Sequence, residues 1–273
     1  MITVASQFSR ILVYTNVLIG LSAGILTLGW VKVNGITQYM DYSFFSFFAT
    51  VAIYNLDKLW KVKWVTEPSE WLIWIIKYNI IIWMLTISSA ILGFYFLLKV
   101  FDFHDFSSVI ILLLGGICAA FYSIPFKKVR LRNIPGSKAF VIAFVWVLIV
   151  GLFPLMNTHL LSSASIYSLL FLFTYFIALT IPFDIRDIDK DEINLKTIPQ
   201  VIGVKKAKYF GMLMLIFSLI FAIFIFNMRI IIFLMPVYGL CSWLIFLTNR
   251  RSSWWHFALI DLCILLIGLA MFI

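Results

Sequence analysis

Charged residues are scarce in this chain. Of its 273 residues, 12% are charged and 63% are hydrophobic, and the mean hydropathy is +1.06. A soluble globular domain carries about 25% charged residues, so this composition excludes a soluble protein and indicates a membrane protein. The alternating segments of about ten residues that mark an outer-membrane barrel are not found. Apolar segments of roughly 20 residues are found, and that length spans the hydrocarbon core as a helix.

Cysteines and familiar catalytic patterns are also few. The three cysteines, Cys118, Cys241 and Cys263, fall inside predicted helices and form no CxxC pair. Their placement excludes a disulfide framework and a cysteine-based zinc site, and we interpret them as small buried apolar residues. A Gly-rich phosphate loop and an HExxH pattern are absent from the sequence.

The apolar segments predict an all-α membrane protein with nine transmembrane helices in a single multi-pass domain covering residues 1–273. The first segment lacks a small-residue cleavage signal and is followed by further spans, so we interpret it as a helix and not as a removable signal peptide. The predicted helices cover residues 11–31, 41–60, 76–98, 106–124, 138–156, 164–186, 208–227, 230–248 and 254–272.

Basic residues are distributed unevenly between the predicted loops. Eighteen of the 21 lysines and arginines fall on one side of the nine helices, and only Lys32, Lys99 and Arg229 fall on the other. The positive-inside rule makes the crowded side cytoplasmic. We therefore predict a cell-membrane protein with its N-terminus in the cytoplasm and its C-terminus outside. The net charge of +9 follows from this topology and from contact with anionic lipids, without a role in nucleic-acid binding.

The scarce carboxylates gather in the segment PFDIRDIDKDE, Pro182–Glu192, which directly follows the sixth apolar run. It holds five of the twelve acidic residues of the chain. If the helix continues, a rotation of about 100° per residue places Asp184, Asp187 and Asp191 on one face, with Asp189 nearly opposite. Carboxylates on one stripe repel one another and destabilise the helix unless they are compensated.

Two kinds of compensation are open. A Mg²⁺ ion would remove the repulsion, and such an ion typically uses one or two carboxylates together with phosphate oxygens of a substrate. The alternative is a solvated helix end in which Arg186 and Lys190 form salt bridges with the aspartates. The first interpretation makes the segment a metal site, and the second makes it an ordinary helix terminus.

A second acidic position, Asp57, lies near the end of the second predicted helix. The second and sixth helices are four crossings apart, so they run in the same direction and end on the cytoplasmic side. Asp57 could therefore face the aspartates of the sixth helix across a cavity, although a lone aspartate at a helix end is often only an interfacial residue.

The basic segment Tyr122–Lys138 lies on the same side, where it could bind a diphosphate or simply supply the positive-inside signal. Lys127 and Lys138, which are closest to helix ends, are its candidates for binding.

At this point the sequence resembles a known family. DIRDIDKDEINLKTIPQVIG, Asp184–Gly203, is similar to the second aspartate-rich motif of the UbiA superfamily of intramembrane prenyltransferases, with Asp187 and Asp191 as its DxxxD pair. The resemblance extends over the whole chain and implies a UbiA-like helical bundle with a polar cavity on the cytoplasmic side. Further matching positions are Thr197, Pro199, Gly203, Tyr122, Ser123 and Pro125.

The first motif of that family departs from its usual form, NxxxDxxxD. Counted from Asn55, the two aspartate positions hold Leu59 and Lys63. Counted with Asp57 as the first aspartate, the second position holds Lys61. We predict that the Lys61 ammonium contacts the diphosphate in place of a second metal ion. A lysine that reaches the headgroup level of the membrane is the alternative.

The resemblance implies Mg²⁺-dependent transfer of a prenyl group from a polyprenyl diphosphate to an acceptor of unknown chemistry within the membrane. The metal and the basic side chains would neutralise the departing diphosphate. The implied metal ligands are Asp57, Asp184, Asp187 and Asp191, of which Asp57, Asp187 and Asp191 are the implied catalytic residues. The implied substrate contacts are Lys61, Tyr122, Lys127, Lys138 and Arg186.

Other interpretations stay open. Because the first motif has lost an acid, the chain could be a non-catalytic protein of the same fold that binds lipid or a protein partner. CDP-alcohol phosphotransferases also end their motif in DxxxD, but the DGxxAR that opens it is absent here.

Asp261 lies inside the ninth predicted helix, where an ionisable residue is a functional candidate. An internal hydrogen bond and a role near the acceptor are both consistent with its position.

Overall fold

The computed structural model describes residues 10–62, 70–102, 106–123, 134–163, 165–189, 191 and 195–272, and every regular element within them is helical. This confirms the all-α prediction for the described part of the chain. The helices are α2 (Val17–Val33), α3 (Tyr39–Val62), α4 (Glu70–Lys77), α5 (Asn79–Val100), α6 (Phe106–Ser123), α7 (Lys138–Trp146), α8 (Phe153–Asn157), α9 (Ser165–Arg186), α10 (Ile198–Ile202), α11 (Val204–Ile225), α12 (Met228–Leu247) and α13 (Trp254–Phe272), with a π-helix, η2 (Val147–Leu152), between α7 and α8.

Six described helical segments are long and apolar enough to cross a membrane: α5, the continuous segment Lys138–Asn157, α9, α11, α12 and α13. Two shorter apolar helices are α2 and Phe106–Ala119. These segments identify a multi-pass membrane protein. The number of nine crossings and the orientation of the termini stay predictions.

Several helix boundaries differ from the predicted ones. The seventh predicted helix, 208–227, begins at Val204, because Gly203 has a φ of +81° and separates it from the short α10, which has Pro199 in its first turn. The predicted helix 76–98 covers the last residues of α4 and most of α5, which meet at the non-helical Tyr78. A glycine or proline would have marked that junction, but neither is present there.

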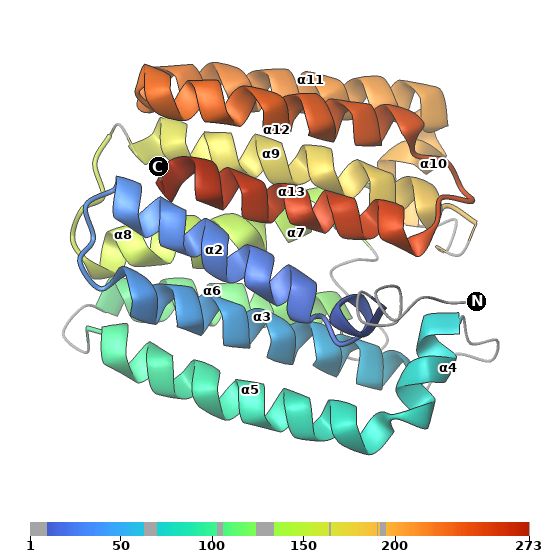
Figure 1. The fold of residues 1–273 in the computed structure, drawn as a ribbon, viewed down its shortest axis with the longest axis horizontal. Coiled ribbons are helices and arrows are strands. Elements are labelled where there is room, and N and C mark those ends of the chain that lie inside the picture. The colour runs from blue at the N-terminus through green and yellow to red at the C-terminus, as the bar shows by residue number, and fades with distance from the viewer. Residues whose placement is uncertain are drawn as a thin grey trace.

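Two glycines bring α2 and α13 into close contact. A Cβ atom added at Gly268 would lie 2.4 Å from the carbonyl oxygen of Ile25, and one added at Gly29 would lie 2.1 Å from the carbonyl oxygen of Gly268. Small residues of this kind let the backbones of membrane helices approach closely. On its other side α2 packs against α3, and α3 packs against α5 (Figure 1).

The α9 helix is the most deeply buried of the six long apolar segments. It packs against α7 and α11, and Phe171, Tyr175 and Phe176 on it are almost completely buried. The hydroxyl of Tyr175 donates a hydrogen bond to the carbonyl oxygen of Cys263 at 3.0 Å, which connects α9 to α13. All three cysteines are free; Cys241 and Cys263 are buried, as predicted, whereas Cys118 is half-buried.

The α3 and α9 helices run in the same direction and end at the same end of the bundle (Figure 1). Asp57 near the end of α3 and Asp184 near the end of α9 therefore lie at this end. The α7 helix begins there too, because its first residue, Lys138, contacts Asp184. The ends of α3 and α9 and the start of α7 thus position the polar groups described next.

Candidate functional site

A buried lysine joins two of the predicted aspartates. The Lys138 Nζ lies 2.9 Å from Asp184 Oδ1 and 2.6 Å from Asp191 Oδ2. The side chains of Lys138, Asp184 and Asp191 are only 9%, 2% and 6% exposed. This arrangement is not the solvated helix end that was one of the two sequence interpretations, because water has little access to these charges. We refer to Asp184, Lys138 and Asp191 as the lysine–aspartate triad.

Local backbone geometry brings the two aspartates together. The α9 helix ends at Arg186, but helix-like hydrogen bonds continue beyond it, from Asp187 N to Phe183 O at 3.0 Å and from Asp191 N to Asp187 O at 2.8 Å. Asp191 follows Asp184 by seven positions, which is about two turns of a helix. Both carboxylates can therefore reach one ammonium group, as their predicted position on one face requires.

Asp187 has a different partner. Its two carboxylate oxygens accept hydrogen bonds from Nε of Arg186 at 2.9 Å and from its terminal nitrogen at 2.7 Å. The guanidinium also lies over the rings of Phe257 and Phe183, with its carbon atom 4.6 Å and 5.2 Å from the ring centroids. A salt bridge with Arg186 was part of one of the two interpretations of this segment, but nothing in the sequence pointed to Phe257, which comes from α13.

Asp261 belongs to the same charged region. It interacts electrostatically with Arg186 of α9 and with Lys58 of α3. Lys58 in turn interacts with Asp57, Lys61 and Arg186. Lys58 and Asp261 therefore link the charged groups at the ends of α3 and α9 electrostatically.

At the end of α3, Asp57 is paired with a lysine of its own helix. The Lys61 Nζ lies 2.5 Å from Asp57 Oδ2, and the two side chains are 36% and 20% exposed. This is the contact expected for residues four apart on a helix. Asp191 and Asp184 are joined to Lys138 instead, so the described residues place Asp57 in a separate ion pair.

Residues that sequence reasoning missed hold this end of α3 against the start of α2. The side chain of Asn55 accepts a hydrogen bond from Asn16 Nδ2 at 2.8 Å and donates one to Thr15 O at 3.0 Å. Asn16 has a φ of 59° and interrupts the helical backbone there. Lys58 Nζ donates to the carbonyl oxygen of Tyr14 at 3.1 Å, a favourable position for a cation beside the last carbonyls of a helical turn. Asn55 thus acts as a brace between α2 and α3.

A divalent cation binds protein oxygen atoms, and the carboxylates of this region are its candidate ligands. Among the described residues, no three His, Cys, Asp or Glu side chains are grouped so that they could hold a metal ion. Mg²⁺ needs only one or two carboxylates when substrate phosphates complete its shell, and Asp184 and Asp191 supply such a pair. Asp184 Oδ2 is buried and has no hydrogen-bond partner among the described residues, which is unusual for a buried polar atom. The carboxylate pair of Asp184 and Asp191 therefore fits a divalent cation that displaces Lys138, whereas Asp57 offers a single carboxylate, paired with Lys61.

Two other predicted residues cannot be placed in the site. Tyr122 belongs to the last turn of α6, but its side chain is outside the described part of the structure. Lys127 lies outside the described residues.

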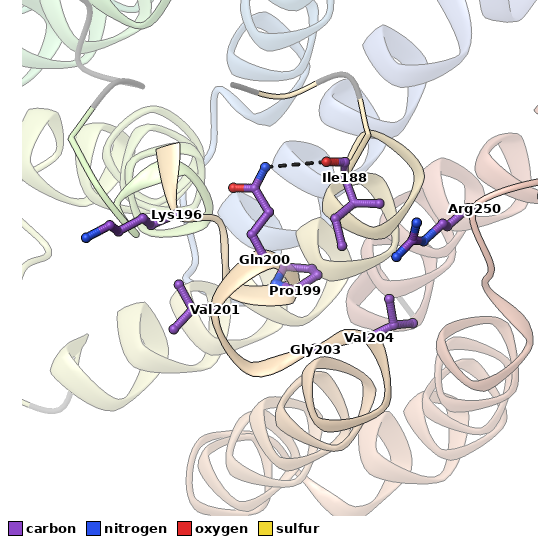
Figure 2. Close-up of a pocket in the computed structure, with 8 residues that line it drawn as sticks. All are labelled: Ile188, Lys196, Pro199, Gln200, Val201, Gly203, Val204 and Arg250. Carbon is purple, nitrogen blue, oxygen red and sulfur yellow. Dashed lines mark hydrogen bonds between the residues drawn. The ribbon is translucent and has the colours of Figure 1, made fainter. Parts of the chain in front are cut away.

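A groove with a volume of about 680 Å³ lies beside the loop that carries Asp191. Figure 2 shows its lining, and within it the side chain of Gln200, whose nitrogen donates to Ile188 O at 3.4 Å. The same nitrogen donates to Asp191 O at 3.1 Å, so Gln200 supports the backbone of the triad. Among the predicted site residues whose side chains the structure describes, none lines this groove, and the predicted polar cavity stays a prediction. The lining residues are Ile188, Lys196, Pro199, Gln200, Val201, Gly203, Val204 and Arg250.

Comparisons with known proteins identify the architecture. No protein-family model and no curated protein matches the sequence. Solved structures do match. A UbiA homologue from Archaeoglobus fulgidus superposes with a TM-score of 0.62 at 15% identity, covering 98% of this chain and 99% of that one. The structure of that homologue bound to GPP and Mg²⁺ gives a TM-score of 0.59 at 13% identity, with 96% and 99% covered.

A digeranylgeranylglyceryl phosphate synthase gives a TM-score of 0.55 at 15% identity, with 97% of each chain covered. These matches span nearly the full length of both chains, while the sequence identities are low. What they establish is the architecture: this chain has the UbiA fold.

Proposed function

We propose that this protein binds a prenyl diphosphate at the cytoplasmic ends of α3, α7 and α9 and transfers the prenyl group to an acceptor within the membrane. The observation that carries this proposal is the lysine–aspartate triad, in which two buried carboxylates meet one ammonium group and leave Asp184 Oδ2 without a partner. The solved UbiA homologue bound to GPP and Mg²⁺ supports it, because that protein shares the fold.

The residues of the chain would divide the binding between them. Asp184 and Asp191 would hold Mg²⁺, while Asp187 keeps its ion pair with Arg186. The ion, when bound, would supply positive charge to stabilise the departing diphosphate. Lys138 and Arg186 would donate charge-assisted hydrogen bonds to phosphate oxygens. The allylic carbon–oxygen bond breaks and its electron pair leaves with the diphosphate, while the acceptor bonds to the carbon and loses a proton.

A second candidate is binding of a prenyl diphosphate or another anionic lipid without transfer. The Asp57–Lys61 ion pair favours it, because the first acidic region then has no second carboxylate to share a metal. This candidate predicts that the ligand is bound but not consumed. It is separated from transfer by measuring diphosphate release in the presence of candidate acceptors, such as an aromatic acid, a quinone precursor, a tetrapyrrole or a phosphosugar.

The test uses the purified full chain in lipid nanodiscs and measures binding of geranyl diphosphate by calorimetry, with Mg²⁺ or with EDTA. Asp184→Asn and Asp191→Asn should abolish the Mg²⁺-dependent binding, because each removes one charge of the carboxylate pair. Asp189→Asn is the matched control, because Asp189 is 65% exposed and, within the described residues, forms its ion pair with Arg250. Equal affinity in the wild type and all three variants would contradict the proposal.

A further inference from the structure

We propose that Lys138 is an exchangeable internal counter-ion. Its ammonium neutralises Asp184 and Asp191 when no divalent cation is bound, and it leaves them for the diphosphate when a cation takes its place. The exchange with diphosphate rests on the proposed function, whereas the competition between Lys138 and a divalent cation stands by itself.

The distances within the lysine–aspartate triad show why a cation is needed there. One ammonium lies within 3 Å of oxygens from two carboxylates, at 2.9 Å and 2.6 Å, and all three side chains are nearly inaccessible to water. Two carboxylates this close to a shared cation repel each other strongly once that cation is gone, because the interior screens charge poorly. Asp184 and Asp191 therefore need a cation at this place, whether it comes from the chain or from solution.

The triad is also incompletely satisfied. Lys138 reaches Oδ1 of Asp184, while Oδ2 of the same carboxylate is buried and has no hydrogen-bond partner. A buried acceptor without a partner is costly. A divalent cation carries the charge that balances two carboxylates, and it can coordinate an oxygen that one ammonium leaves unused. The unpartnered oxygen thus points to a ligand with more charge than Lys138 provides.

The neighbouring ion pair between Arg186 and Asp187 differs from the lysine–aspartate triad in its geometry. Arg186 engages both oxygens of Asp187 through two parallel hydrogen bonds, and its planar guanidinium is held over Phe257 and Phe183. Such a fork is geometrically fixed, whereas a lysine ammonium is a point charge on a flexible stem. Between Lys138 and Arg186, Lys138 is therefore the one suited to exchange.

The position of Lys138 on its helix agrees with this role. It is the first residue of α7, and a cation at a helix N-terminus interacts unfavourably with the helix dipole. Its own helix therefore does not hold the ammonium in place, and the carboxylates do. The displaced ammonium can then donate charge-assisted hydrogen bonds to the diphosphate. Divalent cation and diphosphate should consequently strengthen each other's binding, since such coupling is reciprocal.

The test compares wild type, Lys138→Met and Lys99→Met by thermal unfolding in detergent, with EDTA or with Mg²⁺, and measures Mn²⁺ affinity by electron paramagnetic resonance. Lys138→Met should unfold at a lower temperature in EDTA and be restored by Mg²⁺. It should bind Mn²⁺ about tenfold more tightly than wild type, because the metal no longer displaces an ammonium. Lys99→Met should show neither effect, because Lys99 pairs with the single, partly exposed Asp41.

A second variant covers the case in which Lys138→Met does not fold in EDTA. Lys138→Met with Asp191→Asn removes one positive and one negative charge, so it should fold without metal and should lose the response to Mg²⁺. Unchanged stability and Mn²⁺ affinity in Lys138→Met, or a double variant that still requires Mg²⁺, would overturn the counter-ion role. If the metal effects appear but geranyl diphosphate does not bind to wild type, the proposed function fails and the counter-ion role stands.

Discussion

Replacing Asn55 with alanine should destabilise the protein without a specific effect on metal binding. Asn55 is the residue from which a first NxxxD motif would be counted, yet its side chain is fully buried and joined to Asn16 and Thr15. The substitution removes two buried hydrogen bonds, at 2.8 Å and 3.0 Å. It leaves the Asn16 amide and the Thr15 carbonyl without these partners.

The expected loss in the free energy of unfolding follows from those two hydrogen bonds. A typical hydrogen bond contributes about 1 kcal/mol net, and each buried group left unsatisfied costs about 1–3 kcal/mol, so the free energy of unfolding should fall by about 2–4 kcal/mol. Asn16→Gly removes only the bond of 2.8 Å, and glycine adopts the positive φ of residue 16 without strain. Its loss of stability should therefore be smaller. Asn34→Ala, which removes an intrahelical contact to Trp30 O at the end of α2, is the control and should cost about 0.5 kcal/mol.

Equilibrium unfolding in mixed detergent and SDS measures these differences, and Mn²⁺ binding is measured on the same samples. A double-mutant cycle of Asn16 and Asn55 should show a coupling of about 1 kcal/mol, since contacting residues are not additive. If Asn55→Ala kept wild-type stability but lost Mn²⁺ affinity, Asn55 would be part of a binding site and the brace between α2 and α3 would be refuted.

Two further predictions concern the end of α3 and the topology. Lys61→Ala should weaken geranyl diphosphate binding by about tenfold, because one charge-assisted hydrogen bond is lost. Lys205→Ala is the control and should leave the binding unchanged. Titration should find one Mn²⁺ per chain, and two would contradict the role of Lys61. In a variant without its natural cysteines, Lys205→Cys should react with an impermeant maleimide only from the cytoplasmic side, and Gly35→Cys only from outside. Labelling from the opposite side at either position would contradict the predicted orientation.

The amino-acid sequence alone determined the class of protein and the direction of its main helices. Length and hydropathy identify a membrane-spanning segment without reference to its neighbours, because lipid selects apolar helices of a set length. Counting crossings then predicted that α3 and α9 run the same way, and the structure confirms it. The spacing of Asp184 and Asp191 predicted a shared face because helical periodicity is local.

Only the tertiary structure decided which cation meets which carboxylate. Lys138 and Asp191 are 53 positions apart, and they meet because α7 packs against α9. Arg186 of α9 likewise lies over Phe257 of α13, and Asn55 of α3 meets Asn16 at the start of α2. Sequence spacing predicts contacts along one helix, as between Asp57 and Lys61, because those distances follow from the helix geometry. Contacts between helices depend on how whole surfaces pack, and close approaches such as that of Gly29 and Gly268 set them.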